Sequence, residues 1–473
     1  MNAHGKVKFI SPNEVKDLLR SEDLLKCGAH SLFCIPRGSG GTEQPWRQYF
    51  VAQHKFVTQV FNDRDHFQTS HYDRLMDALG SRLRMVPGED QKLSGDRIKV
   101  LNAALAQYQP KIAGKPVTIA DWLEHTSAAR SHEVLANLAS NPPTAKRFNL
   151  VWDYARIVPY LIFTDFMGVT LPVRADFGAK GWNFLRNIRR PFPPVRMQGV
   201  QGEVWTAVFW SQMFFAQLFG NFDNTSTIRR LAKYGLGKLE DYVHFLIEHP
   251  ASLDPDGLFA AILDANNKAA PADKLSSHDI CAIFIEFLGT AYLLPGIAFC
   301  NHISNLFDPK FTQASGIDFT KFVAALRQSS GNLPWQTHYD ELFRLVPVTT
   351  LVDRVAAAKD GVDAMIDGVP IQSGDRVTLV VSRAARDPRE FGATQHCSSN
   401  GAEKYLPHAA RRYLEFRPAT AATRCFGREW ALIMLRQMTL AMDGGFVVRP
   451  LERDGKMSEL MEGIPDRMMV RFH

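Results

Sequence analysis

An apolar run from Ser276 to Phe307 limits the possible folds of this chain more than any other segment. Ile280 to Cys300 is long enough to cross a membrane as a helix, but Glu286 and the internal Pro295 argue against contact with lipid. A helix that is apolar on all sides in a soluble protein runs through the core. Because proline cannot donate a backbone hydrogen bond, we expect this core helix to kink near Ala291.

The composition indicates a globular, soluble protein. The chain has 473 residues, of which 45% are hydrophobic and 22% charged, and its net charge of +6 does not indicate nucleic acid binding. None of the six cysteines forms a CxxC pair, which favours a reducing compartment. The polar N-terminus predicts neither a signal peptide nor a transmembrane anchor. We therefore expect a cytoplasmic protein.

Residue periodicity predicts a mainly α fold with a small β-sheet region (α+β). The expected helices before the core helix are 100–108, 119–140, 151–167, 204–219 and 226–248, and a short one follows at 335–345. The aromatic crowding in 204–219 is explained either by core packing or by the roof of an apolar ligand pocket. Short strands are expected at 364–366, 369–371 and 377–381.

A cysteine directly precedes the last predicted helix, in the segment Arg424-Cys-Phe-Gly427-Arg-Glu-Trp430. A thiolate at a helix N-terminus is stabilised by unpaired N–H groups and by the helix dipole. Heme-thiolate proteins bind iron with such a sulfur. The alternative is that Cys425 is only a small buried hydrophobic residue, as free cysteines usually are.

An acid and a base lie on one face of the short helix at 335–345, because Glu341 and Arg344 are three residues apart. Such pairs are usually solvated surface contacts. Downstream, Asp367-Gly368 and Ser373-Gly-Asp375 are typical of tight turns between strands.

In this order, four features resemble the cytochrome P-450 family: the core helix, Glu341-x-x-Arg344, the hairpin leading to Arg386-Asp-Pro388, and Cys425-x-Gly427. The resemblance covers roughly residues 55–470. It implies one domain with a long central helix and a heme between that helix and the cysteine loop. Residues 1–54 are then an N-terminal segment with short strands and a helix, and 55–473 form the heme domain.

The resemblance implies heme b (iron protoporphyrin IX) as the cofactor and Cys425 as the iron ligand. Gly427 would keep the chain close to the macrocycle. The family's loop before the cysteine is altered here, since its nearest aromatic, Phe416, lies nine residues upstream and its basic residue is Arg424. Different hydrogen bonds to the sulfur would shift the redox potential.

Four further residues receive roles from the resemblance. Glu341 and Arg344 would form a buried pair that supports the loop beneath the heme. Arg97 and Arg354 would bind the heme propionates, because guanidinium groups match carboxylates. Leu93 stands where many relatives have Trp or His.

The core helix departs from the family's acid–threonine element, which relays protons to bound dioxygen. Alignment of the helix end places that element on Tyr292-Leu-Leu294-Pro295, which has no acid. A second register uses Glu286 and Thr290 and requires a bulge in the helix. Both registers remain open.

The implied function is that of a monooxygenase that oxidises a hydrophobic small molecule and takes electrons from a ferredoxin- or flavodoxin-type donor. The alternative is a peroxide-dependent peroxygenase or hydroperoxide isomerase, because such relatives often lack the acid–alcohol pair. A heme sensor or carrier is a third, non-enzymatic hypothesis.

Overall fold

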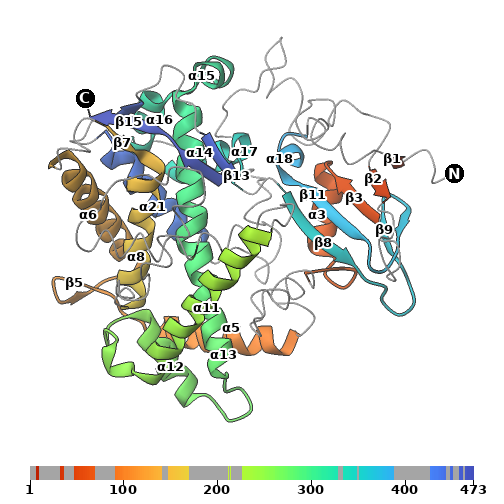
Figure 1. The fold of residues 1–473 in the computed structure, drawn as a ribbon, viewed down its shortest axis with the longest axis horizontal. Coiled ribbons are helices and arrows are strands. Elements are labelled where there is room, and N and C mark those ends of the chain that lie inside the picture. Colours follow the sequence, from red (N-terminus) through yellow and green to blue (C-terminus); the bar gives the residue numbers. More distant parts are fainter. Residues whose placement is uncertain are drawn as a thin grey trace. The chain divides into compact units, whose positions relative to one another are not determined.

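The computed structural model describes residues 7–9, 32–36, 47–69, 91–140, 147–169, 211, 214, 226–328, 334–348, 351–387, 427–443, 448–450, 458–461 and 464–472. The chain divides into two compact units. We call Met1–Arg74 with Pro309–Cys425 the sheet unit, and Leu75–Asp308 with Phe426–His473 the helical unit. Figure 1 shows the helices and strands of both units.

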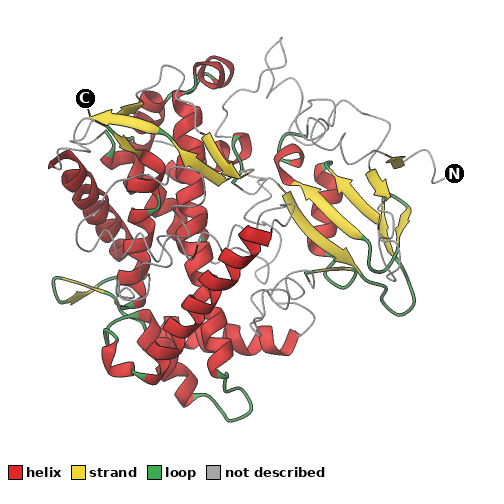
Figure 2. Ribbon diagram, in the orientation of Figure 1, coloured by secondary structure: helices red, strands yellow, loops and turns green. Residues whose placement is uncertain are grey.

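A six-stranded sheet forms the centre of the sheet unit (Figure 2). Its strands, in spatial order, are β1 (Val7–Phe9), β2 (Leu32–Pro36), β3 (Arg47–Val51), β11 (Arg376–Val380), β8 (Leu351–Ala356) and β4 (Phe67–Gln68). β1 pairs with β2 and β3 with β11 in parallel, and the other pairs are antiparallel. The N-terminal strands therefore belong to the same sheet as strands more than 300 residues later.

The predicted hairpin is confirmed as β9 (Ala364–Ile366) and β10 (Val369–Ile371). Its turn residues Asp367 and Gly368 have φ values of 52° and 74°, as a two-residue hairpin turn requires. The helices of this unit are α3 (His54–Asn62), α15 (Pro309–Ser315), α16 (Phe319–Arg327), α17 (Trp335–Leu345) and α18 (Val381–Ala384).

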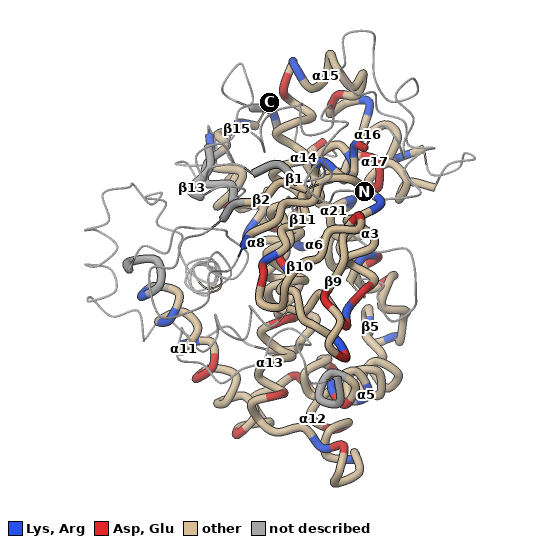
Figure 3. Tube along the Cα trace, turned by 90° about the vertical axis from the view of Figure 1, so that its right-hand side faces the viewer, with Lys and Arg blue, Asp and Glu red and all other residues tan. Residues whose placement is uncertain are grey.

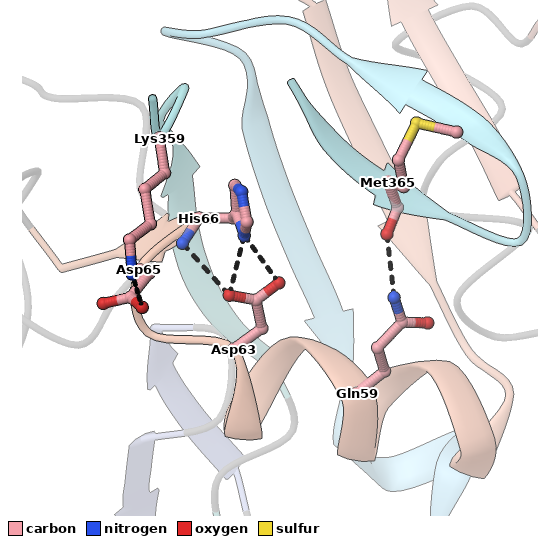
Figure 4. Close-up of polar contacts among 6 residues, drawn as sticks. All are labelled: Gln59, Asp63, Asp65, His66, Lys359 and Met365. Atoms are coloured by element: carbon pink, nitrogen blue, oxygen red, sulfur yellow. Dashed lines mark hydrogen bonds and ion pairs between the residues drawn. The ribbon is translucent and has the colours of Figure 1, made fainter. Parts of the chain in front are cut away.

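Polar contacts fasten the end of α3 to its surroundings (Figure 4). His66 Nδ1 lies 2.9 Å from each Asp63 carboxylate oxygen, and Lys359 pairs with Asp65. Gln59 donates to the Met365 carbonyl at 2.8 Å. These contacts tie the helix to β4 and β9 by side chains.

The helical unit contains the remaining elements. Its helices are α5 (Gln91–Gln107), α6 (Ile119–Ser140), η2 (Leu150–Ala155), α8 (Ile157–Met167), α11 (Ser226–Glu248), η4 (Pro250–Ser252), α12 (Leu258–Lys268), α13 (Ser277–Leu288), η5 (Gly289–Leu293), α14 (Leu294–Phe307) and α21 (Arg428–Ala441). Its strands are β5 (Lys111–Ile112), β6 (Lys115–Pro116), β7 (Phe148–Asn149), β12 (Val448–Pro450), β13 (Ser458–Met461), β14 (Ile464–Arg467) and β15 (Met469–Phe472), paired as β12-β15-β7, β13-β14 and β5-β6.

The core helix comprises α13, η5 and α14, and its predicted distortion is confirmed. η5 is a π-helical turn in which the Leu294 N–H bonds the Gly289 carbonyl, five residues back. The helix is long and apolar enough to span a membrane, yet 72% of its apolar window is buried inside the protein. α14 carries no charged residue (Figure 3), as expected of a core helix.

The single helix predicted at 151–167 is wrong in one respect, because the chain breaks into the π-helical η2 and the α-helix α8 at Arg156. This break places Pro159 in the first turn of α8, where a missing N–H donor costs little. Gly168 ends α8 with φ 67°, as predicted. α5 begins nine residues before the predicted start at Val100. The predicted helix 204–219 lies outside the described residues except for Ser211 and Phe214.

Candidate functional site

Helix α17 holds a buried ion pair. Arg344 donates from Nε to Glu341 Oε2 at 2.9 Å and from Nη2 to Oε1 at 2.8 Å. The two side chains are 1% and 0% exposed, so the pair is shielded from water and each charge needs its partner. The predicted pairing is confirmed, and the surface alternative is wrong. Arg386 also donates to the carbonyl of Leu345, at the end of this helix.

Arg354 lies on β8, 8% exposed, in the same unit. Its Nη1 donates to the Asp353 carbonyl at 2.7 Å, and its guanidinium lies 5.5 Å from the centre of the Phe61 ring. The neighbouring Asp353 accepts from Thr378 at 2.5 Å, which in turn accepts from Gln48 at 2.8 Å. A buried polar network thus holds the strand that carries Arg354.

Arg97 lies on α5 and pairs with Asp279 at 2.9 Å. Asp279 also completes a capping box with Ser276 at the start of α13. Burial raises the pKa of Asp279, but hydrogen bonds from Ser276 and Arg97 outweigh it, so the pKa lies below its usual value. Arg97 is therefore already partly neutralised in the structure.

The core-helix residues of both predicted registers lie at or next to η5. Thr290 is exposed, and its Oγ1 donates to the Glu286 carbonyl at 2.8 Å. Pro295 is buried in the first turn of α14, and Leu294 is half-buried before it. The bulge that the Glu286–Thr290 register needs is therefore present in the described helix.

A cavity with room for about one water molecule lies between η2 and the core helix. Arg156, only 4% exposed, is the charged residue among its lining, and its guanidinium stacks 3.6 Å from the Trp152 ring centre. The lining residues are Val151, Arg156, Tyr292, Leu293, Gly296, Ile297 and Cys300. Burial raises the pKa of the Cys300 thiol to about 12, although nearby Arg156 opposes this.

Sequence reasoning missed this cavity and its buried arginine. The signal that could have found it is the spacing of Trp152 and Arg156, since residues four apart share a helix face and Arg stacks on indole rings. That Arg156 lies beside the core helix depends on a close crossing at Gly296. A Cβ there would lie 2.7 Å from the Ala155 carbonyl oxygen, so only glycine permits this approach.

The predicted last helix is confirmed as α21, with Gly427 at its N-cap and Glu429 in its first turn. Trp430 packs against Phe166 of α8 at 5.1 Å in an edge-to-face contact. Cys425, Phe416 and Arg424 lie outside the described residues. Their predicted roles, and that of Gly427 beside a macrocycle, stay predictions.

The helices and strands define a mainly α protein with a long, locally bulged core helix and a small mixed sheet. No protein family model and no curated protein matches the sequence. Among solved structures, CYP109Q5 from Chondromyces apiculatus matches 98% of both chains at 14% identity with a TM-score of 0.63. The cytochrome P-450 CREJ matches 90% of this chain and 91% of its own at 15% identity and a TM-score of 0.61.

A third match is P-450 BioI in complex with an acyl carrier protein ligated to hexadec-9Z-enoic acid, over 97% of this chain and 100% of that one, at 13% identity and a TM-score of 0.63. The chain thus has the cytochrome P-450 fold. The fold predicted from the ordered motifs is confirmed, at sequence identities that carry the fold alone.

Proposed function

We propose that this protein is a heme-thiolate monooxygenase that oxidises a hydrophobic small molecule. One observation carries the proposal: Cys425 stands two residues before Gly427, the N-cap of α21, in a chain with the P-450 fold. Unpaired N–H groups and the dipole at a helix N-terminus favour the thiolate, the form that binds iron.

Two features support heme binding. Cys425 would supply the single soft ligand that a heme-thiolate protein needs. The buried Glu341–Arg344 pair on α17 would support the loop beneath the heme. When bound, heme would supply an iron centre that activates dioxygen.

We assign Arg354 and Arg97 to the heme propionates, because guanidinium groups match carboxylates. Arg97 forms an ion pair with Asp279, so a propionate would compete with a carboxylate already bound. We expect Arg354→Ala and Arg97→Ala each to weaken heme retention.

For proton delivery, the Glu286–Thr290 register has the stronger support. The π-helical turn supplies the bulge that this register requires, and Thr290 Oγ1 holds its proton toward the Glu286 carbonyl. In the other register, burial raises the pKa of the Tyr292 hydroxyl well above its usual value. The side chains of Leu294 and Pro295 have no proton to transfer.

The substrate class and partners follow from the same proposal. A hydrophobic substrate suits an apolar core helix, and a ferredoxin- or flavodoxin-type protein would supply electrons. P-450 BioI, a protein of this fold, forms a complex with an acyl carrier protein ligated to hexadec-9Z-enoic acid, which has a long apolar chain. We place the protein in the cytoplasm as a soluble enzyme.

The test is turnover of a panel of fatty acids and aromatic compounds under two conditions. Product formation with dioxygen and an electron-donor system, but not with hydrogen peroxide alone, is the expected result. Product formation with peroxide or a lipid hydroperoxide, without donors, would contradict monooxygenase function and favour the peroxide-dependent alternative.

A further inference from the structure

Two histidines face each other across neighbouring helices of the helical unit. His244 lies on α11 and His278 lies in the first turn of α13, and the two helices pack side by side (Figure 1). Their ring centroids are 5.3 Å apart and their planes are perpendicular, at 89°. His278 is exposed and His244 half-buried, so the pair is reachable from solvent.

The ring nitrogens of this pair are uncommitted. Within the described residues, neither ring makes a hydrogen bond or ion pair, and their mutual contact is the interaction they have. Other histidines differ: His249 bonds the Phe245 carbonyl through Nδ1 at 3.0 Å, and His66 bonds Asp63. Uncommitted neutral imidazoles are good ligands for divalent transition metals.

The spacing fits a shared metal ion. Two imidazoles on a tetrahedral zinc ion, with Zn–N bonds of about 2.0–2.1 Å, place their ring centroids roughly 5 Å apart. Both nitrogens must point at the ion, which requires a turn of one ring from the present perpendicular arrangement. The exposed His278 can make that turn, because its χ2 torsion has a broad energy profile.

The backbone on both sides is already fixed. The capping box of Ser276 and Asp279 locks the first turn of α13, where His278 lies. Buried Val243 and Leu246 hold α11 against the core on either side of His244. Metal binding would therefore order only two side chains, which keeps its entropic cost low.

A carboxylate lies one turn away on the same face. Glu240 precedes His244 by four residues, and it faces Cys281, whose thiol pKa is raised to about 12 by burial and, less, by the Glu240 charge. Among the described residues no three metal-binding side chains converge, so water would complete the coordination.

We propose that His244 and His278 form a two-imidazole site for a divalent transition-metal ion of the zinc and nickel class, which cross-links α11 to α13. Glu240 adds a negative charge near the site and raises its affinity for cations. The inference uses only this helix pair and does not depend on heme binding or on monooxygenase activity.

The test is isothermal titration of the full-length protein with NiCl2, after removal of bound metal with EDTA. His278→Ala is the principal variant, because the exposed ring contributes little to packing. Because this variant removes one of the two imidazole ligands, we expect it to lose one equivalent of bound Ni2+ or to bind that equivalent at least about tenfold more weakly. His244→Ala should lose the same equivalent, and the double variant should lose no more.

His249→Ala is the matched control, since His249 follows the same helix and is exposed; it should keep every equivalent. The unfolding midpoint supplies a second readout: NiCl2 should raise it in the wild type and raise it less in His278→Ala. Equal Ni2+ stoichiometry and affinity in the wild type and His278→Ala would overturn the proposal, as would an equal midpoint shift.

Discussion

Two helical segments of the helical unit are each interrupted by a π-helical turn that is followed by a proline. The two interruptions differ in the polarity of the side chains around them. In the core helix, the π-helical turn η5 is followed by α14 with Pro295 in its first turn; in the other, η2 is followed by α8 with Pro159 in its first turn. In both, the break moves a proline to a position where no N–H donor is needed.

The surroundings differ in polarity. The core-helix break has Thr290 as a local polar contact, bonded to its own helix, whereas η2 buries the carboxyl of Asp153 and is followed by the buried guanidinium of Arg156. The break in the core helix thus reshapes an apolar helix, whereas the break at η2 holds charged groups inside the protein. The two segments meet where Gly296 approaches Ala155.

The largest effect is expected at the crossing of the two segments, at Gly296. Gly296→Val places a branched side chain against the Ala155 carbonyl oxygen, 2.7 Å from the Cβ position. We expect a loss of about 3 kcal/mol or more in unfolding free energy, measured by urea denaturation. Gly237→Ala on α11, where a Cβ meets nothing within 4 Å, is the control and should be neutral or stabilising. Equal effects at both positions would disprove a tight crossing.

Asp153 tests the charged character of η2. Burial raises the pKa of this carboxyl from 3.8 to about 6, although the Asn149 N–H opposes it. The folded state therefore binds this proton more tightly than the unfolded state, and the associated stability is present below the unfolded pKa and lost as pH rises through about 6. The loss is on the order of 2–3 kcal/mol.

Asp153→Asn should therefore flatten the decline of unfolding free energy between pH 4 and about 7, measured by denaturant titration at several pH values. Asp165→Asn, which changes a carboxylate paired with Arg130 near the surface, is the comparison variant and should keep that decline. A slope identical in wild type and Asp153→Asn would show that Asp153 does not titrate with the predicted shift.

The two prolines should respond differently to replacement. Pro295→Ala supplies a backbone N–H, which the Ala291 carbonyl would accept in a continuous α-helix. We therefore expect η5 to relax toward α-helix and the free energy of unfolding to rise by about 1 kcal/mol. Pro159→Ala should have almost no effect, because η2 ends at Ala155. Hydrogen exchange is the measurement: amides 291–296 should become slower in Pro295→Ala. Unchanged exchange there would mean that another contact causes the bulge.

Thr290→Val should have the smallest effect on stability, within about 0.5 kcal/mol, because a hydroxyl bonded to its own helix stabilises little. Coupling of donor electrons to product is the more informative measurement, with Thr290→Ser as the control that keeps the hydroxyl. Unchanged coupling in Thr290→Val would contradict the proposal that Glu286 and Thr290 deliver protons.

Much of the fold could be predicted because its signals are local. Ile119–Ser140, Ser226–Glu248 and Trp335–Leu345 begin and end at the predicted residues, since their apolar periodicity changes at both ends. The kink before Pro295 was predictable because proline removes a particular donor.

The rest depends on contacts between distant residues. The Arg156 cavity and the Gly296–Ala155 approach join segments about 140 positions apart, and no local pattern encodes such a meeting. Pro159 was visible in the sequence, yet the π-helical register of η2 depends on what packs against it. The Arg97–Asp279 pair also joins residues far apart in the sequence, and neither residue predicts the other as its partner.

The ferrous–carbon monoxide absorption spectrum of the heme-reconstituted protein tests whether Cys425 binds the heme iron. We expect the wild type to show the red-shifted Soret band typical of thiolate ligation, and Cys425→Ser to lose that band while circular dichroism stays unchanged. A wild type that takes up no heme, or a Cys425→Ser variant with the same Soret band, would contradict the claim that the sulfur at position 425 binds iron.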